Sequence, residues 1–131
     1  MKELMNMLDW HMPEAVQMQG RARAKELSDI TPFLQPCTPE HNKNVWDNCA
    51  RILAERSDEE LAPHIIPLLQ WLQDMNWPGA LIVLSRLTAF ADTDALHAAM
   101  ARCMTEAKKT HDAVWEQNLH LLETRERDKS E

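Results

Sequence analysis

Apolar residues recur at helical spacing along almost the whole chain. In the segment 43–56 they stand at Val45 and then four, seven and eight positions later, which places them on one face of a helix. Strong helix formers dominate the composition, and the chain holds only two glycines. The pattern predicts an all-α protein. The expected helices cover residues 12–27, 43–56, 63–75, 78–90, 92–109 and 111–125.

Local signals mark the ends of these segments. Ser57 and Glu60 have the spacing of a capping box, which predicts a helix start. Residues 35–44 contain two prolines and no periodicity, which predicts a loop. From residue 126 onward the chain is entirely polar, and such an end usually frays. We therefore expect a single helical-repeat domain over residues 1–125 and a polar C-terminal tail over residues 126–131.

The chain also repeats itself. ITPFLQ at residues 30–35 matches IIPLLQ at residues 65–70, an offset of 35. CARIL and LSRLT match at the same offset, with an arginine at the third position of each. VWDNCARILAER at residues 45–56 matches VWEQNLHLLETR at residues 114–125, an offset of 69 that is close to twice the first. A period of this length that holds two helices indicates a helical-hairpin repeat.

Hairpins of this kind bury their apolar faces by stacking on one another. We expect about three hairpins in a right-handed stack, an α-solenoid, preceded by an N-terminal helix. The segment GALIVLSRL at residues 79–87 is apolar almost all round, as expected for a helix with neighbours on every side. It belongs to the central hairpin. The alternative to a true repeat is that these sequence matches arise by chance among leucine-rich helices.

The stretch WLQDMNWPGA, residues 71–80, concentrates two tryptophans, a proline and a glycine. Trp71 continues the apolar face of the helix before it. Asn76 or Trp77 is the expected N-cap of the next helix, because Pro78 suits a first helical turn. Gly79 leaves room where two helices approach, and Trp77 can fold over the turn. We interpret the stretch as the elbow of the central hairpin, with a direct ligand contact as the alternative.

Three segments together resemble a bacterial family of unknown function. WLQDMNWPGA, MPEAVQMQGRARAKEL and NKNVWDNCARILAERSDEEL are similar to the family catalogued as domain of unknown function 5071, over roughly residues 10–122. WLQDMNWP is the most specific of these strings. The resemblance implies a HEAT-like helical repeat and supplies no catalytic residues. Some helical-repeat proteins of this kind serve as immunity proteins in toxin systems.

Charge and cysteine content narrow the classes of partner. The net charge of −7 argues against nucleic acid, whose phosphates need a cationic surface, and suits a basic protein partner. The three cysteines form no CxxC pair, which is typical of a reducing compartment. The longest strongly apolar run, residues 80–84, is too short to cross a bilayer, so no membrane contact is expected. These features favour a cytoplasmic protein.

No catalytic or metal-binding motif emerges from the sequence. The six histidines form no HExxH, and the chain has neither a GxSxG nor a glycine-rich phosphate loop. His111, Asp112 and Glu116 can meet on one helical face, and Cys37 stands four positions before His41, as a Cys/His nucleophile pair would need. A solvated helix start and a turn are the better explanations of these groups. We expect neither an enzyme nor a bound cofactor or metal.

A partner-binding surface remains. The repeat makes two tryptophans equivalent, and each is followed by an acid and an amide. The candidate partner-binding residues are Trp46, Asp47, Asn48, Trp115, Glu116 and Gln117. Packing residues of the repeat are the alternative for both rings, which makes the acids the better contacts.

The leading hypothesis is a non-catalytic protein-binding module, most concretely an immunity protein that neutralises a basic bacterial toxin, as a monomer or weak dimer. The alternatives are a helical-repeat scaffold, a homo-oligomeric structural protein, or a His/Cys metal-dependent enzyme.

Overall fold

The computed structural model describes residues 1–129, and this part of the chain is helical without any strand. The prediction of an all-α protein is confirmed. The α-helices are α1 (Lys2–Met7), α2 (Glu14–Ala24), α3 (Lys43–Ala54), α4 (Asp58–Leu61), α5 (Ile65–Gln70), α6 (Ala80–Thr88), α7 (Thr93–Lys109) and α8 (Ala113–Lys129). Single 3₁₀ turns cover Thr31–Phe33, Ala62–His64 and Trp71–Gln73.

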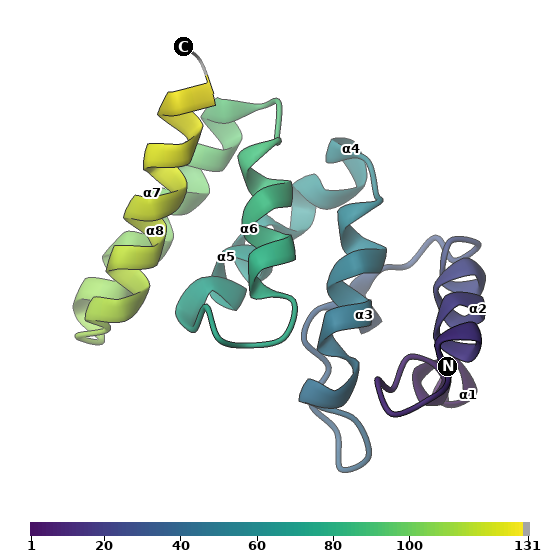
Figure 1. Cartoon of the computed structure of the whole chain (residues 1–131). Helices are drawn as coiled ribbons and strands as arrows, with labels where there is room; N and C mark the ends of the chain where they lie inside the picture. The colour runs from purple at the N-terminus through teal and green to yellow at the C-terminus, as the bar shows by residue number, and fades with distance from the viewer. Residues whose placement is uncertain (130–131) are drawn as a thin grey trace.

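The helices form two groups that share one core. α2 packs on α3, α3 on α6, and α6 on α8, so these four follow one another across the molecule (Figure 1). Behind them α5 packs on α7, and α7 packs on α8. The core between the two groups contains fully buried side chains from both, among them Leu53, Leu69, Leu84 and Leu96. The helices α3, α5, α6, α7 and α8 therefore each pack against a helix that is not their neighbour along the chain.

Basic side chains cap the carbonyl ends of successive helices. Arg56, just after α3, donates to the carbonyls of Ala24, the last residue of α2, and of Leu27 beyond it, both at 2.7 Å. Arg86 near the end of α6 donates to the Arg56 carbonyl at 2.9 Å. Lys129 at the end of α8 donates to the Thr88 carbonyl at 2.6 Å. These bonds satisfy acceptors that a helix end leaves free, and they show that α2, α3, α6 and α8 end on the same side.

The C-terminal expectation was wrong for residues 126–129. α8 runs to Lys129, and Glu126 is buried beside His97, so this segment is packed rather than frayed. Composition suggested a tail, because the apolar positions stop at Leu122. The contacts that hold the last turn are polar. Residues 130–131 of the expected tail lie outside the described residues.

The length of one helix and the presence of another also differ from the expectation. The segment 63–75 contains only the short helix α5 between two 3₁₀ turns, and it ends where Asp74 becomes extended. α1 was not expected at all, although Leu4 and Leu8 from this region are buried. Short helices of this kind depend on tertiary packing, because so few turns give little stability on their own.

The elbow stretch wraps around a cluster of tryptophan rings. Trp71 is fully buried, and its indole Nε1 donates to the Pro78 carbonyl at 3.0 Å. The Trp46 ring of α3 meets Trp71 and Trp77 edge to face, with centroids 6.1 and 5.5 Å apart. Gly79, with φ of +86°, is the N-cap of α6, where Asn76 or Trp77 was expected.

Asn76 itself is exposed on the turn, and its backbone N–H donates to the Asp74 carboxylate at 2.8 Å.

Candidate functional site: the surfaces beside the last helix

Three of the six candidate partner-binding residues are buried. Trp46 donates from Nε1 to the Pro36 carbonyl at 2.8 Å, and Trp115 donates to the Leu69 carbonyl at 3.0 Å. Asn48 donates to the Leu8 carbonyl at 2.7 Å. Less than a tenth of each residue is exposed, so none of the three can contact a partner directly. The expectation of a surface made of both rings and Asn48 was wrong, because in each case the polar atom holds another segment of the same chain.

The other three candidates lie on the surface but not together. Asp47 on α3 is half-buried and pairs with Arg51 one turn later, at 3.2 Å. Glu116 is half-buried and Gln117 is exposed, both in the first turns of α8. α6 stands between α3 and α8. The repeat in the sequence therefore does not bring the two acids into one contact surface.

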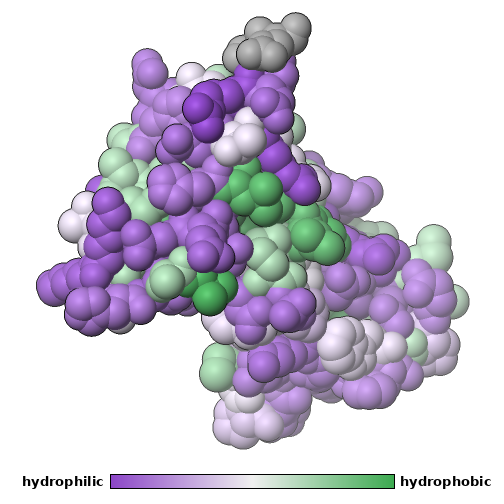
Figure 2. Space-filling model, turned by 60° about the vertical axis from the view of Figure 1, so that its left-hand side comes forward, coloured by the Kyte–Doolittle hydropathy of each residue, from purple (hydrophilic) through white to green (hydrophobic). Residues whose placement is uncertain are grey.

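The exposed apolar side chains of the central and last helices form a patch. Leu81 of α6 is 63% exposed, and on α8 Val114 is 56% and Leu121 is 40% exposed. We call these three residues the α6–α8 patch. Figure 2 shows apolar surface gathered in a hollow on the face that this view brings forward. The expectation that residues 79–87 are buried on every side was wrong at Leu81.

Helix geometry places the α6–α8 patch between its two helices. Val83 of α6 lines a small cavity of about 10 Å³ together with Ala50 of α3, so that flank of α6 faces α3. Leu81 lies two residues earlier, about 200° round the helix, and faces the side of α8. Val114 and Leu121 are seven residues apart, two turns along one flank of α8. Leu121 is turned about 200° from Glu123, which faces α7, so this flank looks toward α6.

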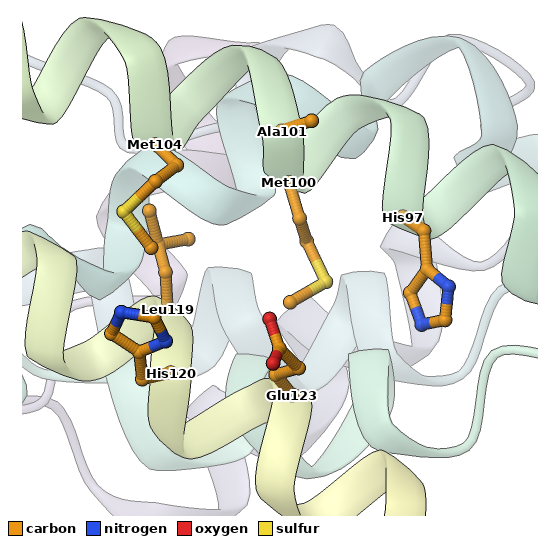
Figure 3. A pocket seen from close by; sticks show the side chains of 7 residues that line it. All are labelled: His97, Met100, Ala101, Met104, Leu119, His120 and Glu123. Atoms are coloured by element: carbon orange, nitrogen blue, oxygen red, sulfur yellow. The ribbon is translucent and has the colours of Figure 1, made fainter.

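A groove of about 240 Å³ runs along the other flank of α8, between α7 and α8 (Figure 3). We call it the α7–α8 groove. Met100, Met104 and Leu119 give it an apolar lining. The polar lining residues are His97 on α7, and His120 and Glu123 on α8. Glu116 precedes His120 by one turn and so falls on the same flank of α8.

His97 joins the α7–α8 groove to a second hollow beyond it. This hollow is lined by Thr93, His97, Glu123, Glu126, Arg127 and Lys129. The Glu126 side chain is only 4% exposed, and its Oε2 contacts His97 Nε2. Its other oxygen, Oε1, has no hydrogen-bond partner, and the Lys129 ammonium lies 3.7 Å away. The structure thus holds a buried carboxylate at the end of the groove, in contact with His97 and close to the Lys129 ammonium.

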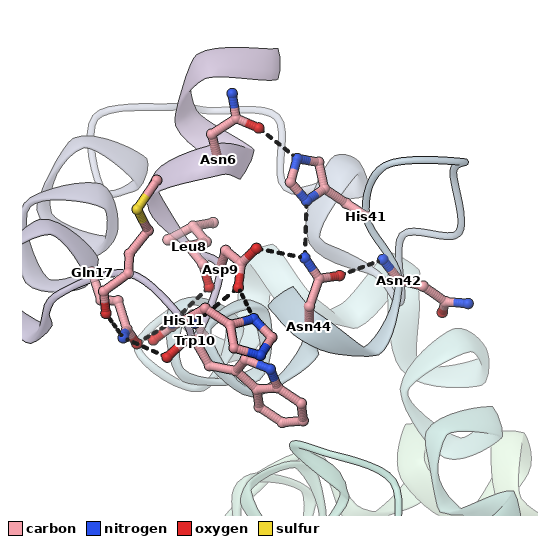
Figure 4. Close-up of polar contacts among 11 residues, drawn as sticks. Asn6, Leu8, Asp9, Trp10, His11, Gln17, His41, Asn42 and Asn44 are labelled. Atoms are coloured by element: carbon pink, nitrogen blue, oxygen red, sulfur yellow. Dashed lines mark hydrogen bonds and ion pairs between the residues drawn. The ribbon is translucent and has the colours of Figure 1, made fainter.

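The residue groups that resembled catalytic pairs in the sequence make other hydrogen bonds in the structure. The His41 ring contacts Asn6 at 2.7 Å and Asn44 at 3.2 Å, within a polar network that ties α1 to the start of α3 (Figure 4). Asp112 accepts from the Trp115 backbone N–H at 3.0 Å, the bond of a helix cap. Cys37 is exposed and is not among the contacts of His41.

The buried thiols are held in their neutral form. Burial raises the pKa of Cys49 to about 12 and that of Cys103 to about 11. A thiol is nucleophilic only as the thiolate, so these two side chains act as small apolar groups. Among residues 1–129, no three His, Cys, Asp or Glu side chains gather as a metal ion would need. Within the same residues, no helix is long and apolar enough to cross a membrane.

Comparisons with known proteins give one match. Residues 38–128 match the profile of the domain of unknown function DUF5071. The match begins later than the resemblance suggested, so the segment 12–27 lies outside it, and it reaches into the last turns of α8. No curated protein and no solved structure matches the chain. Because the match covers more than half of its length, the chain belongs to the DUF5071 family.

Proposed function

We propose that the chain is a non-catalytic protein-binding module, and most concretely an immunity protein that binds and neutralises a basic bacterial toxin. The observation that carries this proposal is the exposed α6–α8 patch. Leu81, Val114 and Leu121 lie on neighbouring helices and are not covered by any described part of the chain. Contiguous exposed apolar surface on a small protein usually marks an interaction site.

Charge supports a basic partner. The net charge of −7 attracts a cationic protein over long range and speeds its association. Gln117 lies three residues after Val114 and four before Leu121 on α8, and it supplies a polar contact at the rim of the patch. An apolar centre with a polar rim is the usual composition of a protein interface.

The arrangement of helices supports a repeat architecture for this module. We propose that the helices form a HEAT-like, right-handed stack of about three hairpins. The contacts α3–α6 and α6–α8 in one group, and α5–α7 in the other, are those expected of stacked hairpins. The row of capping cations, Arg56, Arg86 and Lys129, adds a contact repeated between neighbours.

Co-purification with the product of the neighbouring gene tests the function. We expect a stable complex, and protection of cells that express that product. The double substitution Leu81→Asp with Leu121→Asp is expected to abolish both, because each change places a charge in the centre of the apolar contact. Because both side chains are exposed, the melting temperature is expected to change little.

Met18→Asp is the matched control. Met18 is 57% exposed on α2, far along the chain from the patch, and its substitution is expected to leave the complex intact. A protein that shows no complex and gives no protection contradicts the immunity proposal. A complex that both variants retain contradicts the assignment of the patch.

The same patch also favours a second candidate, a homo-oligomer in which two copies cover each other's apolar residues. Sizing at two concentrations separates the candidates. A mass that doubles with concentration, and stays monomeric for the Leu81→Asp, Leu121→Asp variant, supports the homo-oligomer. A monomer at both concentrations excludes it.

A further inference from the structure

We propose that the α7–α8 groove receives a lysine or arginine side chain from a basic segment of a protein partner. The inference rests on the proposed function, because it assumes a basic partner, but it concerns a different surface from the α6–α8 patch. The groove has two parts that match such a side chain: an apolar trough of about 240 Å³, and carboxylates at its end.

The trough suits the aliphatic stem. Met100, Met104 and Leu119 line it, and thioether side chains adapt their shape to an apolar guest. Lysine and arginine bury their methylene stems along apolar surface while their charged ends reach polar groups. A purely apolar guest would leave the polar end of the groove unused.

The carboxylates suit the cationic end. Glu123 lines both the groove and the hollow beyond it, and its carboxylate has no hydrogen bond or ion pair within the described residues. Glu126 lies behind it as a buried carboxylate, and its Oε1, which lacks a hydrogen-bond partner, has the Lys129 ammonium 3.7 Å away. The nearby Lys129 ammonium already donates to the carbonyls of Thr88 and Phe90, at 2.6 and 3.2 Å. An incoming cation therefore finds in Glu123 a carboxylate that pairs with no cation among the described residues.

The charges of the residues that line the groove indicate the charge of the side chain that it receives. Glu123 is the only carboxylate or basic side chain other than histidine that lines the α7–α8 groove itself. In the hollow beyond, the Arg127 guanidinium lies 3.5 Å from the Thr124 hydroxyl to which it donates. An anionic guest would meet Glu123 at the groove itself, while in the hollow beyond it Arg127 and Lys129 stand beside Glu123 and Glu126. The geometry thus favours a cation with an aliphatic stem.

Fluorescence anisotropy with a fluorescein-labelled hexalysine peptide tests the proposal on the full chain. We expect saturable binding that Glu123→Gln weakens about tenfold, the usual effect of losing one charge-assisted contact. Ala101→Lys is expected to weaken binding at least as much, because it places a cation at an exposed position of the groove. Both substitutions introduce residues that favour helices.

The control variant carries Glu26→Gln and Glu59→Gln. Both are exposed carboxylates outside the groove, and removing them changes the net charge more than Glu123→Gln does. We expect the control to bind like the unmodified protein. Equal weakening by the control and by Glu123→Gln shows a general charge effect and overturns the proposal.

A second peptide tests the apolar trough. Hexa-2,4-diaminobutyrate keeps the six charges and shortens each stem, so it should bind several-fold more weakly than hexalysine. Equal binding of the two peptides, or no binding of hexalysine, overturns the proposed groove. If the groove proposal fails but a partner still co-purifies through the α6–α8 patch, the proposed function remains supported. The two experiments therefore distinguish failure of the groove proposal from failure of the proposed function.

Discussion

At the scale of single residues, Gly79 shows how closely two elements approach. Its φ of +86° lies in the left-handed region, which strains any residue with a side chain. A Cβ at this position would lie 2.6 Å from the Ala50 Cβ and 2.9 Å from the Trp46 carbonyl oxygen. The glycine therefore lets the turn before α6 rest directly on α3.

Gly79→Ala is expected to destabilise the protein by about 2 to 4 kcal/mol, from strain at positive φ and from the clash with α3. Urea unfolding followed by circular dichroism measures the change. Gly20→Ala is the comparison, because Gly20 lies inside α2, where alanine gains about 1 kcal/mol of helix propensity that offsets its tight contacts. A Gly79 variant as stable as the original protein would contradict this account of the turn.

At the scale of elements, helix ends hold the group α2, α3, α6 and α8 together. A helix leaves its last carbonyls without partners, and here a cation from the next helix satisfies them. Arg86 also pairs with Asp58, and the backbone N–H of Ala91 donates to the same carboxylate at 2.9 Å. The Ala91 N–H and then the Arg86 guanidinium lower the pKa of Asp58. The last turn of α8 takes part in the same capping arrangement, because the Lys129 ammonium donates to the Thr88 carbonyl at the end of α6.

A chain that stops after Arg125 is therefore expected to lose about 1 to 3 kcal/mol, because the carbonyls of Thr88 and Phe90 lose their donor and His97 loses its partner. The melting midpoint by calorimetry checks this. Removal of residues 130–131 alone is the control and leaves these bonds in place. If both truncations melted at the temperature of the full chain, the packed last turn would have no role in stability.

At the scale of the whole molecule, the N-terminal segment lies outside the matched family region but belongs to the same core. Asn48 of α3 donates to the Leu8 carbonyl and to Gln17 Oε1, and accepts from Arg21 at 2.6 Å. The network of Figure 4 adds contacts between α1 and the segment before α3. These bonds fix the N-terminal helices on the family domain.

Asn48→Ala is expected to cost about 1 to 3 kcal/mol, because the Leu8 carbonyl and the Arg21 guanidinium lose a partner in a largely buried site. Asp47→Ala, one residue earlier, removes only an exposed pair with Arg51 and is expected to cost less than about 0.5 kcal/mol. Urea midpoints of the two variants check the difference. Equal midpoints would mean that the amide network does not stabilise the N-terminal segment.

The candidate surfaces were less predictable than the helices. Trp46 and Trp115 align in the repeat, and both are buried, but their indoles bond to carbonyls at different places, Pro36 and Leu69. Glu123 and Glu126 received no role from the sequence, because carboxylates near the end of a helix look like ordinary solvated residues. Only the approach of α7 turns one of them into a groove residue and buries the other.

The sequence by itself determined the helical class and most helix positions, because apolar spacing and capping residues act within a few turns of the chain. It also suggested the family through a resemblance in three segments, and the match over residues 38–128 confirms that family. The tertiary structure decided which flank of each helix is buried by neighbouring helices and which is exposed to solvent. Leu81 and Leu84 are the same residue type on the same helix, and one is exposed while the other is buried. Burial depends on the neighbours that a helix meets, and those neighbours come from distant parts of the chain.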